Sequence, residues 1–203
     1  YEYRDAFKKA GREMPDQYRP AHYRAALPGR EGGFEPREHE GPVETWREKA
    51  SKFSDFAHEA LLNNDKVLEY LAGRGLDYQA VKRYRLGWFQ GENNKPCMFR
   101  PRHSWGLPEQ YKSGGRAKKL WIPRGIVIPC FKGGEVYRLR IRRPGRDLLK
   151  DSDVKYYIVP GSGMEVMGHN PDRQAFVVVE AELDAMMIAC HAGHLVGTVA
   201  LGS

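Results

Sequence analysis

Two carboxylates, Glu180 and Asp184, follow an apolar run near the C-terminal end of the sequence. Glu180 closes that run, and Asp184 falls in the first turn of a helix predicted to begin at Glu182. Ligands of parallel α/β sheets gather beyond the carboxyl ends of the strands, and Mg²⁺ binds one or two carboxylates together with substrate phosphates. The pattern therefore predicts a divalent-metal site at Glu180 and Asp184. Acidic residues also favour helix N-termini because of the helix dipole, so a purely structural role stays open.

Basic side chains alternate along another predicted strand, residues 135–143. Arg138, Arg140 and Arg142 lie two residues apart, and Arg143 follows. Because a strand rises about 3.3 Å per residue, guanidinium groups on one face would recur every ~6.6 Å, which suits successive phosphates of a nucleic-acid strand. An edge strand kept soluble by its charge is the alternative. Nearby aromatic residues could stack on nucleobases: Tyr111, Trp121, Tyr137, Tyr156 and Tyr157.

Positive charge is concentrated in one part of the chain. The 33 Lys and Arg residues outnumber the 26 Asp and Glu residues, which gives a formal net charge of +7. Residues 111–146 hold eleven Lys and Arg residues and one acid, Glu135, so this window carries +10 and the remainder −3. Such a concentration indicates a local polyanion site. Non-specific attraction to acidic partners is the alternative.

Composition excludes several classes of protein. The 203 residues, 41% of them apolar, suffice for one or two packed units. No apolar run approaches the roughly 20 residues of a membrane span, and no charged start followed by an apolar stretch suggests secretion. The three scattered cysteines, Cys97, Cys130 and Cys190, argue against a disulfide framework and for a reducing compartment. We therefore expect a cytoplasmic protein without a membrane partner.

The first half of the chain predicts an irregular lead-in and then helices. Residues 1–43 are rich in Pro and Gly and read as a linker. A helical spacing of apolar residues runs from Glu44 to Leu61. Two short helices follow around residues 73–76, with Asp65 and Asp77 as the predicted N-caps. Residues 88–122 show no clear period.

The second half predicts strands and then a β-α-β unit. Residues 125–131 and 135–143 form a predicted hairpin, in which Pro129 suggests an edge strand or a strand end. Residues 175–180 read as a buried strand, 182–191 as a helix and 195–200 as the next strand, which favours a parallel sheet. The predicted fold is an α+β subdomain over 44–170, followed by the beginning of an α/β fold over 171–203.

Four segments, in this order, resemble the RNA polymerase domain of DnaG-type bacterial and phage primases. Residues 68–76 and 81–87 resemble its "YL..RGL … I..F.IG" segment. Residues 125–129 and 136–142 resemble its "R(I/V)(M/V)FPI … G.V.GF.GR" hairpin. Lys155 and Tyr156 resemble the start of "KY.NS.E", while residues 177–184 and 200–203 resemble "VVVEG..D … ALGT", the opening of a TOPRIM fold. The match covers residues 46–203.

The resemblance implies synthesis of short RNA primers on a single-stranded DNA template by metal-dependent nucleotidyl transfer. Glu180 would be the first TOPRIM acid and would act, with Asp184, through Mg²⁺ or Mn²⁺. Ribonucleotides, single-stranded DNA and a replicative helicase of the primosome are the implied partners. The residues predicted to bind nucleic acid are Arg74, Lys118, Lys119, Arg124, Arg138, Arg140, Arg142, Arg143, Lys155 and Tyr156.

The sequence departs from the family pattern at several points. Ala181 replaces a glycine, Gly125 stands where an arginine is usual, and residues 138–141 replace a Gly-Phe-Gly-Gly pattern with Arg-Leu-Arg-Ile. The family's Asp-x-Asp metal motif follows a later strand, which these 203 residues do not reach, and no Cys/His cluster of its zinc module occurs in them. We therefore expect a fragment of a mobile-element primase that binds DNA without making primers. A non-catalytic single-strand-binding module, or another TOPRIM enzyme of the topoisomerase or nuclease kind, is the alternative.

Overall fold

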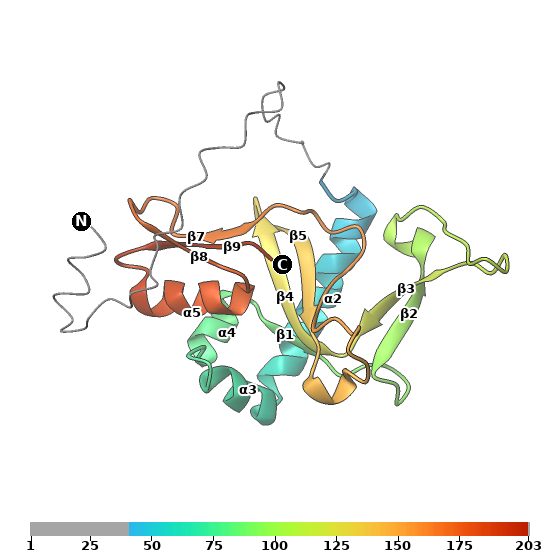
Figure 1. Ribbon diagram of the computed structural model, residues 1–203, viewed down its shortest axis with the longest axis horizontal. Helices are drawn as coiled ribbons and strands as arrows, with labels where there is room; N and C mark the ends of the chain where they lie inside the picture. Colours follow the sequence, from blue (N-terminus) through green and yellow to red (C-terminus); the bar gives the residue numbers. More distant parts are fainter. Residues whose placement is uncertain (1–40, 203) are drawn as a thin grey trace, which may run out of the picture. The chain divides into compact units, whose positions relative to one another are not determined.

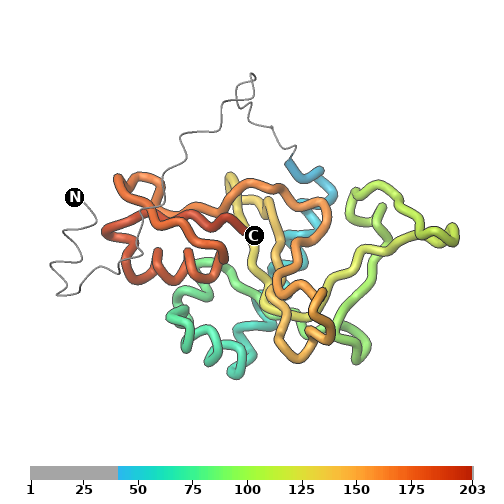
Figure 2. The backbone as a smooth tube through the Cα atoms, in the orientation of Figure 1, coloured from blue at the N-terminus to red at the C-terminus, as the bar shows by residue number. Residues whose placement is uncertain are grey.

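The computed structural model describes residues 41–202. The lead-in predicted over residues 1–43 therefore lies outside the described residues, apart from its last three positions. From Glu44 onward, helices combine with antiparallel sheets and one parallel strand pair. The predicted mixed α+β class is confirmed for this part of the chain, whose path Figure 2 traces from residue 41.

Three helices open the described chain in the predicted order: α2 (Glu44–Leu62), α3 (Asp65–Ala72) and α4 (Tyr78–Arg83). The side chain of Asn64 caps α3, because its Oδ1 accepts a hydrogen bond from the Val67 N–H at 3.3 Å. The N-cap predicted at Asp65 is therefore wrong by one residue. Asp77 caps α4 as predicted, accepting from the Ala80 N–H at 2.8 Å.

An antiparallel four-stranded sheet has the order β1 (Gly87–Phe89), β4 (Gly125–Lys132), β5 (Glu135–Arg142) and β6 (Tyr156–Ile158). The predicted hairpin is the β4–β5 pair. Pro129 marks neither of the suggested positions, because β4 lies between β1 and β5 in the sheet order and continues to Lys132. β1 pairs only with residues 125–127, so Pro129 lies beyond it and its missing N–H removes no ladder hydrogen bond there.

Helices pack on both faces of this sheet, as Figure 1 shows for α2 on one side and α3, α4 and α5 (Glu182–Ala192) on the other. Trp46 and Phe53 of α2 join Leu139 in one core cluster. Leu71 of α3 and Leu183 of α5 join residues of β4 in the other. The side chains of residues 136–141 in β5 are consequently buried on both faces.

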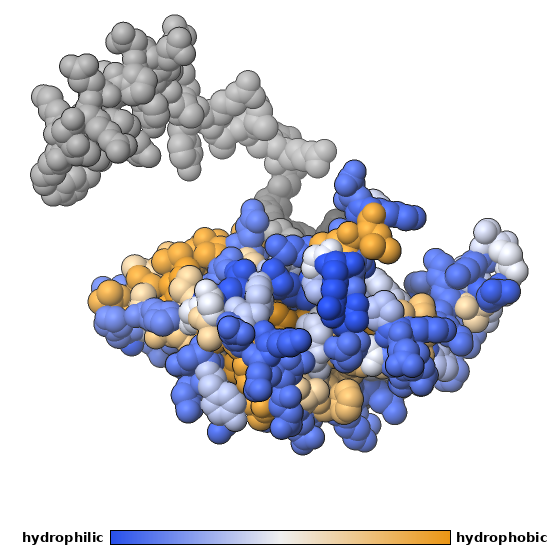
Figure 3. Space-filling view, turned by 90° about the horizontal axis from the view of Figure 1, so that it is seen from below, coloured by the Kyte–Doolittle hydropathy of each residue, from blue (hydrophilic) through white to orange (hydrophobic). Residues whose placement is uncertain are grey.

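A second, three-stranded sheet has the order β7 (Met167–His169), β9 (Gly197–Ala200) and β8 (Phe176–Val179). β8 and β9 are parallel and are joined by α5, while β7 pairs antiparallel with β9. β8 is an edge strand that leaves Phe176 46% and Val178 59% exposed. Figure 3 shows apolar surface at this end of the molecule. The prediction of a buried strand is therefore wrong, since no residue of β8 is buried.

Residues 97–123 form a separate two-stranded β-ribbon, which we call the arm. Its strands are β2 (Cys97–Pro101) and β3 (Lys119–Pro123), joined through a short 3₁₀ helix, η1 (Arg102–Trp105), and a long loop. In Figure 1 the arm extends to the side of the sheet opposite α5. Its tip carries four exposed cations, which we call the basic tip: Lys112, Arg116, Lys118 and Lys119.

The two predicted subdomains, 44–170 and 171–203, share one core cluster. Leu183, Met186 and Ala200 pack in the same cluster as Leu61 and Leu76. The division at residue 170 stays a prediction. Among the helices of residues 41–202, none has the length and apolarity needed to cross a bilayer.

Candidate functional site

A salt bridge joins two of the motif segments across 110 residues of sequence. Nη2 of Arg74, just after α3, lies 2.5 Å from Oδ1 of Asp184 in the first turn of α5. Burial opposes the charge on Arg74, but its hydrogen bonds to Tyr70 and Asp184 outweigh that effect, so the pKa of Arg74 is raised and it stays cationic. The bridge holds the Asp184 carboxylate in place in the first turn of α5.

Tyr70 extends this contact toward the central sheet. Its hydroxyl lies 3.4 Å from Nη1 of Arg74, and the guanidinium of Arg142 lies over its ring, 5.0 Å from the centroid. Arg142, Tyr70, Arg74 and Asp184 thus form a continuous series, which we call the contact row. All four are at least partly exposed, so the row lines a surface that a ligand can reach.

Glu180 stands at the end of β8 with an exposed side chain. Its carboxylate has no hydrogen-bond or ion-pair partner among the described residues, while its backbone carbonyl accepts from the Gly202 N–H at 2.9 Å. One free and one paired carboxylate fit a Mg²⁺ ion whose remaining ligands are water and substrate phosphates. Residues 41–202 contain no group of three His, Cys, Asp or Glu side chains that could hold a metal by themselves.

Two of the predicted phosphate ligands are buried and paired. Arg138 is 1% and Arg140 2% exposed, and both contact the carboxylate of Glu182, which is 0% exposed. Arg138 Nη2 lies 3.1 Å from Oε1, and Arg140 Nη1 lies 2.9 and 2.8 Å from the two oxygens. An exposed ladder of Arg138, Arg140 and Arg142 is therefore wrong, because α5 covers this face of β5. The pair joins β5 to the helix that carries Asp184.

Arg143 and Arg124 also have internal partners. Arg143 donates to the carbonyls of Val154 and Asp147 at 3.1 and 2.7 Å and is 7% exposed. Arg124 donates through Nε to the Asp147 carboxylate at 2.8 Å, and a second bond through Nη2 makes the contact bidentate. The hydrogen bonds from Arg124 lower the pKa of Asp147, so both groups are charged at neutral pH. Both arginines fix the loop after β5 and are not free to bind phosphate.

The remaining predicted cations are accessible. Lys118 and Lys119 of the basic tip and Lys155 before β6 are exposed and make no ion pair with a described residue. Tyr156 is half-buried, because the guanidinium of Arg140 stacks on its ring at 4.6 Å. The predicted set thus divides into an internal group and an accessible group, and the accessible group contains Arg142, Lys155 and the basic tip.

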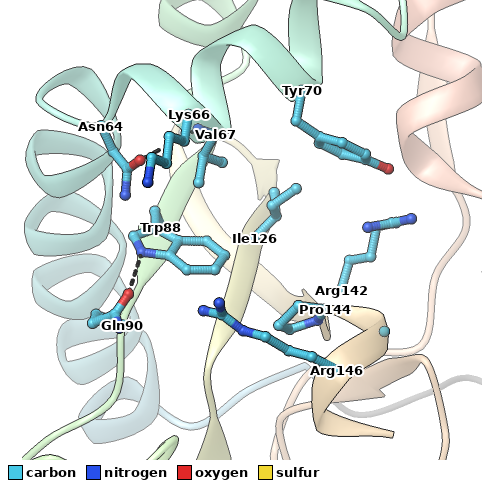
Figure 4. Close-up of a pocket in the computed structure, with 11 residues that line it drawn as sticks. Asn64, Lys66, Val67, Tyr70, Trp88, Gln90, Ile126, Arg142, Pro144 and Arg146 are labelled. Carbon is cyan, nitrogen blue, oxygen red and sulfur yellow. Dashed lines mark hydrogen bonds between the residues drawn. The ribbon is translucent and has the colours of Figure 1, made fainter.

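A cavity of about 590 Å³ opens next to Arg142, between α3, β1 and the loop after β5. Figure 4 shows the Trp88 ring in this cavity, with the side chains of Arg142 and Arg146 reaching in from the other side. Lys66 and Tyr70 line the cavity from α3. Trp88, Lys66 and Arg146 escaped the sequence prediction, although Arg146 lies in the basic window of residues 111–146.

No protein-family model matches the chain, and no curated protein is significantly similar to it. Among solved structures it is similar to the zinc-binding and RNA polymerase domains of Aquifex aeolicus primase, with a TM-score of 0.52 and 21% identity over 79% of this chain and 42% of that one. It is also similar to the RNA polymerase domain of Mycobacterium tuberculosis primase DnaG, with a TM-score of 0.50 and 18% identity over 81% and 58% of the two chains. The chain has the fold of a DnaG-type primase RNA polymerase domain.

The fold of the DnaG-type domain confirms the resemblance read from the four segments. At these identities the likeness concerns the fold, and the chain spans 42% of the Aquifex structure. Within that fold, the contact row brings together residues 68–76, 136–142 and 177–184, three segments that are distant in sequence. Their meeting at Arg142, Tyr70, Arg74 and Asp184 defines the candidate site.

Proposed function

We propose that the chain is the strand- and nucleotide-binding part of a primase RNA polymerase domain, whose reaction builds short RNA primers on single-stranded DNA. The observation that carries the proposal is the Arg74–Asp184 contact, which joins the "YL..RGL" and "VVVEG..D" segments within a DnaG-type fold. The β8-α5-β9 unit would then be the opening of a TOPRIM fold, with Glu180 at the carboxyl end of its first strand.

Each residue of the site has a separate task in this proposal. Arg142 and Lys155 bind phosphates, because neither makes an ion pair with a described residue and both are accessible. Arg74 keeps the Asp184 carboxylate in place. Glu180 and Asp184 would hold Mg²⁺ or Mn²⁺, which stabilises the charge that develops on the attacking and leaving oxygens. Groups held in place before the reaction do not reorganise during it, which favours the transition state.

The described carboxylates also support the proposal that these 203 residues bind nucleic acid without making primers. Of the two proposed metal ligands, Asp184 already has a cationic partner, and only Glu180 has none among the described residues. A metal held by so few carboxylates binds weakly unless phosphates complete its shell. The same observation favours a second candidate function, a non-catalytic single-strand-binding module built on the primase fold.

The test measures binding and catalysis on the same preparation. Fluorescence anisotropy with a labelled single strand gives the slope of log K against log salt for the parent and for Arg142→Gln/Lys155→Gln. Loss of two phosphate contacts should flatten the slope by about 1.4. The matched control is Lys49→Gln/Lys52→Gln, which removes the same charge from exposed positions on α2. Equal slopes for the two double variants would refute the strand-binding role.

Primer synthesis with labelled ribonucleotides tests the proposed inactivity, and metal-dependent nucleotide binding separates the two candidates. We expect no template-dependent product from the 203 residues, and product from them would refute the proposed inactivity. Addition of Mg²⁺ should tighten binding of a nucleoside triphosphate in the parent and not in Glu180→Gln if the chain is part of an enzyme. A nucleotide affinity that changes neither with Mg²⁺ nor in Glu180→Gln supports the non-catalytic module.

A further inference from the structure

A cavity lies beside Arg142, and the proposed metal-binding carboxylates do not account for it. Its volume of about 590 Å³ lies in the range of small-molecule sites. Helix α3, strands β1 and β4, and the 3₁₀ turn η2 (Gly145–Asp147) supply its walls. Because several elements meet around it, the cavity belongs to the fold itself and not to one loop.

Three cations line the cavity, and the described lining residues include no acid: the cations are Lys66, Arg142 and Arg146. None of the three makes an ion pair with a described residue. Nε of Arg142 is buried and has no hydrogen-bond partner in residues 41–202. Two other arginines of this fold, by contrast, are paired, Arg124 with Asp147 and Arg140 with Glu182. Three uncompensated cations around one cavity are the arrangement expected for an anionic ligand.

The other part of the wall is aromatic and apolar. Trp88 is 8% exposed, and its indole N–H donates to Oε1 of Gln90 at 3.1 Å, which fixes the ring. Val67 and Ile126 flank it. Figure 4 shows the Trp88 ring between the α3 residues above it and the Arg146 guanidinium below it. A flat ring entering the cavity would contact the part of the indole that faces it at low entropic cost, because the indole is already held.

We propose that this cavity binds one nucleotide unit, with its base against Trp88 and its phosphate on Arg142 and Arg146. The base stacks on the indole ring of Trp88. The phosphate accepts hydrogen bonds from the planar guanidinium groups, and Lys66 adds a further positive charge. A ligand with only one of these parts, such as inorganic phosphate or an uncharged ring, would leave half of the site unused.

The cavity is joined to the site of the proposed function. Arg142 belongs to both, because its guanidinium stacks on Tyr70, which contacts Arg74 and through it Asp184. The inference therefore rests on the proposed function, and it names the ligand whose phosphate Arg142 binds. The nucleotide unit can belong to a free nucleoside triphosphate or to an unpaired strand, and both have the same ring and phosphate chemistry.

The experiment uses three probes: ATP, inorganic tripolyphosphate and a short single-stranded oligothymidylate. Calorimetry gives affinities for the parent, for Lys66→Gln/Arg146→Gln and for the control Lys49→Gln/Lys52→Gln. We expect the cavity variant to bind the true ligand about tenfold more weakly or worse, as loss of charged hydrogen bonds implies. The control should match the parent. Tripolyphosphate should bind more weakly than ATP if the ring contributes.

Tryptophan fluorescence tests the ring contact directly. The ligand should quench the parent, and Trp88→Phe should lose the quenching while it keeps an aromatic wall and most of the affinity. If only ATP causes quenching that depends on Trp88, the cavity binds the free nucleotide. If only the oligonucleotide causes it, the cavity binds the strand. Persistence of the quenching in Trp88→Phe would refute the proposal.

The cavity and the proposed function fail in different ways. If both ligands bind to the cavity variant as tightly as to the control, the cavity proposal is overturned. In that case strand binding that still depends on Lys155 leaves the proposed function standing. If the folded parent binds neither ATP nor the oligonucleotide, both are overturned.

Discussion

Removal of the buried Glu182 charge should be the most damaging single substitution in the fold. In Glu182→Gln, two guanidinium groups that are 1% and 2% exposed lose their shared carboxylate. Breaking a buried pair by removal of one partner costs about 3–5 kcal/mol, because the remaining charge stays desolvated. Domains are stable by only about 5–15 kcal/mol, so Glu182→Gln should lose a large share of its stability. For a chain of this size the midpoint should fall by roughly 6–20 °C.

Thermal and urea unfolding, followed by circular dichroism, measure this effect. Glu48→Gln removes an exposed carboxylate from α2 and should change stability by less than about 1 kcal/mol. Replacement of all three partners, Arg138→Met/Arg140→Leu/Glu182→Leu, should recover most of the loss, because an apolar cluster needs no charge compensation. A loss below about 1 kcal/mol in Glu182→Gln would show that the pair is not desolvated as the structure implies.

Three further predictions concern the arm, a thiol and an ion pair. Replacement of all four basic-tip residues by Gln should flatten the salt slope of single-strand binding by about 2.8, and an unchanged anisotropy slope would remove the arm from the interface. Burial raises the pKa of the Cys130 thiol to about 11, so Ellman's reagent at about pH 8 should modify Cys97 and Cys190 well before Cys130; equal rates for the three thiols would contradict this. The pKa of Asp147 is lowered from 3.8 by its hydrogen bonds with Arg124, so the stability lost in Asp147→Asn should appear above that pH and vanish as pH falls through the lower folded value. Urea unfolding of parent and variant at neutral and acidic pH checks this, and a gap independent of pH would refute it.

Local patterns predicted the elements that carry the site. The apolar period from Glu44 to Leu61 became α2, and the segment from Glu182 onward became α5. The Gly-rich turn between two apolar strands became the β4–β5 hairpin. These signals are local, because side-chain period and capping depend on neighbours a few residues away. The same holds for the cap at Asp77.

Burial of the arginines could not be predicted in this way. The alternation along β5 shows which residues share a face, but whether that face is covered depends on α5, more than forty residues later in the chain. Glu182 reads equally well as a favourable helix N-terminal acid. Trp88 and Arg146 become neighbours only because β1 pairs with β4 and the chain turns after β5. The arm showed no sequence period because each strand of its two-stranded ribbon has a mixed burial pattern.

Photo-crosslinking tests most directly whether an unpaired strand runs past Glu180. Benzoylphenylalanine in place of Glu180, with the same residue in place of exposed Glu48 on α2 as control, is irradiated with a labelled single strand. We predict a cross-link at position 180 that unlabelled single strand removes and that Arg142→Gln/Lys155→Gln weakens. Equal cross-linking at positions 48 and 180, insensitive to that double variant, would contradict the account.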